Sequence, residues 1–366
     1  MVVRTSGKLT DMTSALTPRT VRVRDAADLI AAVPTLLGFV PERSVVLVGV
    51  DTERAGPVIR HDIVLAGDTA GAEQARAVMR AILEQCAAVC ARERAGAVAA
   101  VVVDDRAGTG RAPFRRLAAE LHTCLTAHGI RLVGAHAAPA LAAGGQWWSL
   151  GTDGATGVLP DPFSSPLAVA AIAEGRVVHR SRRALADILA CRNPAERDRV
   201  EALLAATDRA VRPDRTPVSA GAHRLRRLLA QLTGAGGQRL SAAEVAELAL
   251  ALTDTRVRDA ALALVLTVHA AAAEALWLQL VRVLPAPERA EAAMLYGFFA
   301  YVRGDGAIAA VAADAALQAD PGHVMANHLD VAVRAGLSPD VLVEVARSGY
   351  DAAAGLGVAL PPAVLP

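Results

Sequence analysis

Strand-like sequence in this chain is confined to the part before Asp161. Two apolar runs rich in β-branched residues, 44–50 and 97–103, are typical of strands buried on both faces of a sheet. Shorter strands are expected at 20–24, 58–65, 131–136 and 146–150, the last at an edge, and helices at 25–37, 72–94 and 114–128. Because strands and helices alternate, we predict an α/β fold with a mixed, mainly parallel sheet covered by helices on both faces.

Beyond Asp161 the strand signals stop and helix-start signals follow one another. Ser165-Pro166 and Ser181 are N-cap candidates, and 193–196 and 241–244 read as capping boxes. The stretch 260–281 is rich in apolar residues but contains Glu274, and a glutamate is costly inside a bilayer. We therefore predict an all-α helical-hairpin array with two helices in that stretch and no membrane span.

Part of the array has the spacing of a tetratricopeptide repeat. Gly297, Ala309, Ala316 and Pro321 fall at its small-residue and proline positions, while Ala293 stands where the signature tryptophan would be. Gly304 falls in the expected turn between the two helices. The domains predicted are a flexible tail at 1–18, an α/β domain with trailing helices at 19–210, a linker at 211–222, a tetratricopeptide-like array at 223–350 and a tail at 351–366.

Charge and cysteine content point to a cytoplasmic protein. The net charge of +1 divides unevenly, with 13 Arg against 6 Asp and Glu over 176–227 and 3 Arg against 8 Asp and Glu over 284–344. These two segments can attract each other, or each can attract a different partner. Lys8 is the only lysine, which indicates a GC-rich coding sequence. Four cysteines in a chain of 366 residues make no disulfide framework, and 1–19 lacks the apolar core of a signal peptide.

The best catalytic candidates follow the ends of predicted strands. Asp51, Asp104, Asp105 and His136 each stand at such an end, and ligands of parallel α/β sheets bind at the carboxyl ends of strands. Carboxylates and an imidazole gathered there can hold a metal or act as acid and base. The alternative is that these aspartates are ordinary turn and cap residues. No specific cofactor is indicated, and no metal ligand set is assigned.

Ligand-binding candidates lie near the same predicted edge. Arg106 and Arg111 belong to a glycine-containing loop that can hold an anion such as phosphate. Trp148 can stack on a ring, although in a strand Trp147 and Trp148 point to opposite faces, so one is expected in the core and the other exposed. The chain contains no Walker loop, no Gly-x-Gly-x-x-Gly motif after a strand and no Gly-x-Ser-x-Gly elbow.

Three further groups have both a functional and a plain structural interpretation. Cys86 and Cys90 share a helix face and can join Cys124 or His122 in a metal or redox site, but buried thiols are the commoner outcome. The pair His61-Asp62 is expected to make a local hydrogen bond. The helix over 223–232 is basic and amphipathic. Its candidates for binding nucleic acid are Arg224, Arg226 and Arg227.

Several short motifs resemble one family. Residues 36–41 and 44–49, then Arg60, Asp62 and Trp148, look like the opening half of an actinobacterial family called domain-of-unknown-function number 4192. The resemblance continues through these residues: 164–166, Gly175, 181–182, Leu185, Trp277, 304–305, Ala315, Leu317 and 320–321. It covers about 21–341 and implies no activity. Family members commonly carry a Cys-Cys-Pro segment after the tryptophan, where this chain has 151–154 without cysteine.

Three functions remain open on this basis. The first is a binding or regulatory module that uses its helical array to hold a protein partner. The second is a metal-assisted hydrolase or nucleotide-processing enzyme at the carboxyl edge of the sheet. The third is an Arg-rich nucleic-acid-binding accessory protein, which predicts binding that weakens steeply with salt.

Overall fold

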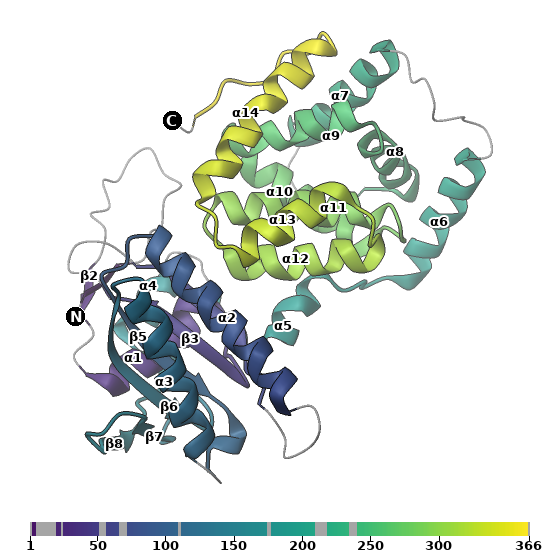
Figure 1. The fold of residues 1–366 in the computed structure, drawn as a ribbon. Coiled ribbons are helices and arrows are strands. Elements are labelled where there is room, and N and C mark those ends of the chain that lie inside the picture. The colour runs from purple at the N-terminus through teal and green to yellow at the C-terminus, as the bar shows by residue number, and fades with distance from the viewer. Residues whose placement is uncertain are drawn as a thin grey trace. The chain divides into compact units, whose positions relative to one another are not determined.

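The computed structural model describes residues 2–4, 20–22, 25–50, 56–65, 72–108, 111–173, 177–208, 218–233 and 240–364. The chain forms two compact units, Met1–Leu185 and Ala186–Pro366. The first holds the strands and the second is helical (Figure 1). The expected order of an α/β part followed by a helical array is therefore confirmed. Strands β1 (Val2–Arg4) and β2 (Thr20–Arg22) form a separate antiparallel pair.

The first unit is built on a six-stranded mixed sheet. Its order is β4 (Val58–Asp62), β3 (Ser44–Gly49), β5 (Ala97–Val103), β6 (Arg131–Ala138), β7 (Gln146–Ser149) and β8 (Thr156–Val158). Only β5 and β6 pair in parallel, so the expectation of a mainly parallel sheet was wrong. The short connections β3–β4, β6–β7 and β7–β8 allow only antiparallel pairing. Furthermore, β4 and β5 run in the same direction but have β3 between them, running the other way.

Helices cover both faces of this sheet. Helices α2 (Ala72–Arg92) and α3 (Ala112–Ala127) pack on one face, and α1 (Ala26–Leu37) packs on the other. Consecutive residues of β3 enter different cores: Val45 faces the α2–α3 side, and Val46 faces the α1 side. The α1 side also carries a short 3-10 helix, η2 (Pro162–Ser164), and α4 (Pro166–Ala173).

Local capping chemistry begins α1 and α4, and ends α1, as the sequence predicts. The carboxylate of Asp25 accepts the backbone N–H of Asp28 at the start of α1, and Gly38 ends that helix with φ of 76°. The hydroxyl of Ser165 accepts the N–H of Ala168 in α4. These contacts satisfy backbone groups that a helix end would otherwise leave unpaired.

The second unit contains the helical array (Figure 1). Its helices are α6 (Pro194–Asp208), α7 (Val218–Thr233), α8 (Ala242–Leu252), α9 (Thr255–Leu262), α10 (Ala270–Val283), α11 (Arg289–Val302), α12 (Gly306–Ala319), α13 (Val324–Arg334) and α14 (Pro339–Gly355), preceded by α5 (Arg182–Ala186), which spans the division between the units. The described residues of this unit also form the 3-10 helices η3 (Asp187–Leu189) and η5 (Ala263–Leu266). The predicted capping box at Ser241 is present. At Asn193 only half of the box forms, because its side-chain oxygen accepts the Glu196 N–H while the Glu196 carboxylate accepts the Asn193 side-chain amide and not the backbone N–H.

The core of the array is closely packed around few aromatic side chains. Trp277 is fully buried and meets Phe299 edge to face, with ring centroids 6.1 Å apart. Helices α11 and α12 pack so closely that a Cβ at Gly297 would lie 2.9 Å from the Cβ of Ala312. Gly304 makes the turn between them with φ of 88°. The expected two helices over 260–281 are present, and none of the described helices is long and apolar enough to span a membrane.

Three boundaries differ from those expected. The α/β domain was predicted to extend to 210, whereas the first compact unit ends at Leu185. Helix α7 begins at Val218, inside the predicted linker 211–222, of which 211–217 lie outside the described residues. Its apolar face is buried and holds the helix in the array. The predicted tail from 351 continues α14 and then packs back, because the Tyr350 hydroxyl donates to the carbonyl of Pro361 at 2.9 Å, and the N–H of Val364 donates to the carbonyl of Leu266 at 2.7 Å.

Candidate functional site

The strands that precede the predicted carboxylates do not all end at one edge of the sheet. Strand β3 is antiparallel to β5, so its last residue, Gly49, pairs with Val98 near the start of β5. Asp104 follows the opposite end of β5. Asp51 itself lies outside the described residues. The prediction of a common edge failed because it assumed that β3 and β5 were parallel.

His136 also lies elsewhere than the sequence indicated. Strand β6 continues to Ala138, so His136 is two residues inside the strand and pairs with Val101 of β5. Asp104, by contrast, donates its N–H to the carbonyl of Ala138 at the end of β6. The structure therefore brings together Asp104 and Asp105 but does not add His136 to them at the strand end.

Asp104 is completely buried and is held by its own loop. Its carboxylate accepts the Arg106 backbone N–H at 2.9 Å and the Arg106 side-chain Nε and Nη2 at 2.8 and 2.6 Å. This bidentate pairing compensates the buried negative charge of Asp104. The guanidinium of Arg106, which was predicted to bind an anion, is thus paired with Asp104. The pair can shape the loop that follows β5, and the carboxylate has little room for a metal.

Asp105 forms a second, exposed arginine pair. Its two oxygens accept Nε and Nη2 of Arg43 at 2.9 and 3.0 Å, and hydrogen bonding to Arg43 lowers the pKa of Asp105. Arg43 has φ of 44°, an uncommon conformation for a residue with a side chain. Next to it, the Arg60 guanidinium donates to the Ser44 hydroxyl at 2.8 Å and to Asp62. Burial lowers the pKa of Arg60.

The aromatic candidates are partly brought together. The Arg111 guanidinium lies over the Trp148 ring, 4.9 Å from its centroid, which is the geometry of a cation–π contact. Both tryptophans are buried, however, at 8% exposure for Trp147 and 5% for Trp148. Strand β7 is not an edge, because β8 pairs beside it. The expected exposed ring is absent because each face of β7 meets a core, with Trp148 on the α2–α3 side and Trp147 on the α1 side. Trp148 supports Arg111 and does not present a free stacking face.

A group that the sequence analysis missed surrounds His136. Ser149 is its direct cross-strand neighbour on β7, and Asp153 follows in the next turn. A hydrogen bond from Ser149 lowers the pKa of Asp153. Burial lowers the pKa of His136, while the charge of Asp153 raises it, and His136 Nδ1 is buried without a hydrogen-bond partner. The only sequence signal was position, because Asp153 stands in the segment 151–154 that differs from the family pattern.

The cysteines considered for a metal or redox site are packed in the interior of the first unit. Cys86 and Cys90 are buried in α2, and burial raises their pKa values to about 12 and about 11. Cys124 of α3 is close enough to add to the shift at Cys86. A thiol needs deprotonation to bind a metal or attack a substrate, so these are poor ligands and nucleophiles. Within the described ranges, no group of three or more His, Cys, Asp and Glu side chains has metal-binding geometry.

The basic residues of α7 have partners within the helical unit. Arg227 pairs with Glu247 of α8 at 2.5 Å, and Arg226 donates to the carbonyl of Gly357 at 3.2 Å. Arg224 is near enough to Asp254 to lower the pKa of that carboxyl. Pairing these side chains within the unit leaves less charge for nucleic-acid phosphates. Among the described ion pairs, none joins the basic segment 176–227 to the acidic segment 284–344.

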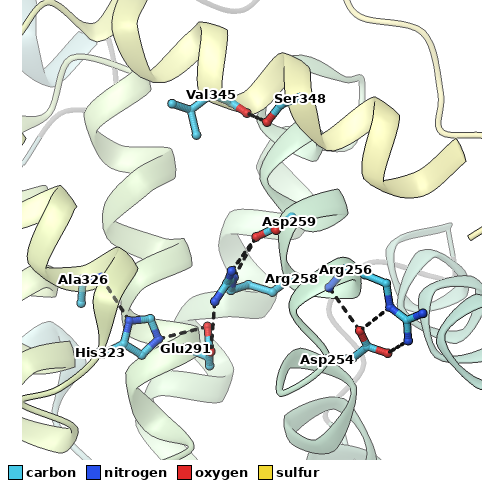
Figure 2. Close-up of polar contacts among 9 residues, drawn as sticks. All are labelled: Asp254, Arg256, Arg258, Asp259, Glu291, His323, Ala326, Val345 and Ser348. Carbon is cyan, nitrogen blue, oxygen red and sulfur yellow. Dashed lines mark hydrogen bonds and ion pairs between the residues drawn. The ribbon is translucent and has the colours of Figure 1, made fainter. Parts of the chain in front are cut away.

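A polar network inside the array is the second feature missed from sequence (Figure 2). His323 Nδ1 accepts the N–H of Ala326 at 3.1 Å and so caps α13. Its Nε2 lies 3.1 Å from Glu291, an ion-pair distance without the alignment of a hydrogen bond. Glu291 is also 3.8 Å from Arg258, which binds Asp259 at 2.7 Å. The network connects α9, α11 and α13, and its mutual pairing marks it as a device that fixes their packing.

Comparison with known proteins adds a family and no activity. No curated protein and no solved structure matches the chain. A family model described as a domain of unknown function (DUF4192) matches residues 27–340. That span includes the six-stranded sheet, the group around His136, the polar network around His323 and most of the array. The chain therefore belongs to the DUF4192 family.

Proposed function

We propose that this chain is a binding or regulatory module whose helical array holds a protein partner. The observation that supports this is the outer face of α13. Val324 and Val331 are 63% and 61% exposed, and they are two helical turns apart on one side. The opposite side of α13, with Ala326 and Leu329, is buried in the array. Two exposed valines at this spacing fit the apolar side of a partner helix.

The tetratricopeptide-like character of the array is part of the same proposal. Close approach of α11 and α12 at Gly297 and the glycine turn at Gly304 are the features that such hairpins use. Helix α13 then packs against α12 and α11, so its outer face borders this hairpin. A helical array of this kind offers an extended surface to a peptide or helix.

A crosslinking experiment tests the partner surface. A photo-crosslinking residue replaces the exposed His328, which lies between the two valines on α13. We expect a discrete crosslinked protein, attached through an amphipathic helix, in cells that contain the native partner. Val324→Asp and Val331→Asp should abolish it. Val268→Asp is the matched control, because Val268 is 67% exposed and lies outside α13.

Two outcomes would contradict the proposal. One is a crosslinked species that persists at full yield in the Val324→Asp/Val331→Asp double variant. The other is a crosslink that Val268→Asp removes just as effectively, since that result would reflect general loss of solubility or folding.

We also propose a cytoplasmic location and an actinobacterial source. The location is supported by the free thiols of Cys86, Cys90, Cys124 and Cys191, which suit a reducing compartment. The source is supported by the near-complete use of Arg in place of Lys. Cell fractionation with an antibody to the chain would test the location, and recovery in the secreted fraction would contradict it.

A further inference from the structure

A buried histidine side chain, His323, begins helix α13 (Figure 2). Its Nδ1 accepts the backbone N–H of Ala326 at 3.1 Å, which is the contact that an N-cap residue makes. A ring nitrogen that accepts an N–H carries no proton of its own. The observed cap therefore belongs to the neutral form of the ring, in which Nε2 holds the single proton.

The other ring nitrogen faces a carboxylate. Nε2 lies 3.1 Å from an oxygen of Glu291 on α11, and neither atom makes a well-aligned hydrogen bond. Both side chains are largely removed from solvent, at 7% exposure for His323 and 18% for Glu291. A carboxylate at this distance favours the charged form of an imidazole. The two sides of the ring thus favour opposite charge states, because the start of α13 requires the neutral ring and Glu291 favours the charged one.

The other charged groups around α13 come from three elements. Arg258 of α9 is 3.8 Å from Glu291 and competes with the imidazole for its charge. Asp320 precedes the cap, and its carboxylate accepts a backbone N–H of its own loop. Helix α12 presents Asp314, which lies 3.9 Å from Arg334 in the last turn of α13. Carboxylates and guanidiniums ordinarily keep their charge between about pH 5 and 8, whereas an imidazole changes charge in that range.

Protonation of the ring removes the cap. Nδ1 then becomes a donor and would point its N–H at the N–H of Ala326, so that neither hydrogen has an acceptor. Ala326 is fully buried, and water can replace the lost acceptor only if the first turn of α13 opens. At the same time the charged ring gains an ion pair with Glu291.

We propose that His323 is a pH-operated cap: the neutral ring holds the start of α13, and the protonated ring releases it in exchange for an ion pair with Glu291. The proton comes from solvent and binds Nδ1, and no other covalent bond changes. This inference goes beyond the proposed function. Val324 follows His323 directly, so release would also disturb one of the two exposed valines of the partner surface, and only that consequence rests on the proposed function.

Hydrogen exchange followed by mass spectrometry, on the full chain without a partner, tests the cap at about pH 8 and about pH 5. Labelling times are scaled for the pH dependence of intrinsic exchange. We expect the first turn of α13 to exchange about fivefold faster at the lower pH, the effect of losing one N-cap. The start of α12 is the internal reference, because the carboxylate of Asp305 caps it through the N–H of Ile308.

Two replacements of His323 separate the roles of its ring nitrogens. Asn places an acceptor where Nδ1 stands and is a favourable N-cap, so His323→Asn should exchange slowly in the first turn at both pH values. Gln places its amide near the position of Nε2 and does not cap, so His323→Gln should exchange fast at both. His328→Gln is the matched control, since His328 is exposed on the same helix, and it should respond to pH as the wild type does. A general loss of stability would accelerate α12 as well and is thereby recognised.

Glu291→Gln gives a second measurement that leaves the cap itself in place. Without the carboxylate the protonated ring loses its ion pair, so release of α13 should require a lower pH than in the wild type.

The proposal is overturned if the first turn of α13 responds to pH no more than the start of α12 does. It is also overturned if His323→Asn keeps the full response, if His328→Gln removes it, or if His323→Gln exchanges as slowly as the wild type at about pH 8. Release of α13 at an unchanged pH in Glu291→Gln would likewise contradict the exchange of the cap for an ion pair.

Discussion

Helix α14 crosses α9 and η5 at Gly349, and the crossing leaves no space for a side chain. A Cβ at Gly349 would lie 2.5 Å from the carbonyl oxygen of Asp259 and 2.9 Å from the Cβ of Ala263. It would also lie 3.0 Å from the Ala263 backbone nitrogen. None of these atoms can rotate away, so Gly349→Ala must push the helices apart.

We expect Gly349→Ala to destabilise the protein, although the same replacement usually stabilises a helix. In an open helix, replacing Gly with Ala stabilises by roughly 0.5–1 kcal/mol. Overpacking a closely packed interior costs about 1–3 kcal/mol, and the upper end applies where backbone atoms are the obstacle. We therefore expect Gly349→Ala to destabilise the helical unit by about 2 kcal/mol. Gly355→Ala is the matched control in the same helix, because a Cβ there meets nothing within 4 Å.

Hydrogen exchange followed by mass spectrometry gives a local measurement. A loss of about 2 kcal/mol corresponds to roughly thirtyfold faster exchange in peptides of α9 and α14. Gly355→Ala should exchange at the wild-type rate or more slowly. If Gly349→Ala exchanges no faster than Gly355→Ala, the close crossing of α14 over α9 is not present in solution.

Three other predictions concern the charged and titratable groups. Asp104→Asn should lower stability by about 2 kcal/mol, since the buried carboxylate accepts three hydrogen bonds, whereas Asp105→Asn should leave the urea midpoint nearly unchanged; equal effects would contradict the burial difference. The folded-state pKa of His136 is lowered. Its contribution to the free energy of unfolding is therefore complete above the unfolded-state pKa of about 6.5 and is lost as pH falls below that value. His136→Gln should therefore flatten the stability–pH curve below about pH 6.5 by at most about 1.4 kcal/mol per pH unit, and an unchanged curve would refute this. Glu291→Gln should destabilise the array by about 1 kcal/mol in thermal unfolding, because it removes the charge from a partly buried pair with Arg258, and no loss at all would show that the network is not coupled.

Local signals in the sequence predicted the elements well. Asp25 and Ser241 begin helices as their side chains indicate, and the run 97–103 is a fully buried strand. Strand direction could not be obtained in the same way. Runs buried on both faces are typical of parallel sheets, but β3 is buried on both faces because helices cover each side of a mostly antiparallel sheet.

The candidate site was harder to predict because it depends on that direction. Reversing β3 relative to β5 places Gly49, the last residue of β3, at the edge of the sheet opposite to Asp104. The contact between Arg111 and Trp148 was within reach of the sequence, since both were ligand candidates.

The two central strands contain little in their side chains that distinguishes one face of the sheet from the other. A slip of one residue in β3 would exchange Val46 with Val45 and still bury apolar groups on both sides. The correct alignment must then be selected at the strand's two ends. At one end Gly49 passes so close to Pro57 that a Cβ would lie 2.6 Å from the proline ring, and at the other Ser44 accepts the Arg60 guanidinium. A single-residue insertion in β3 would displace one of these end contacts whichever way the strand shifts, so the ends, and not the apolar centre, determine which pairing of the sheet forms.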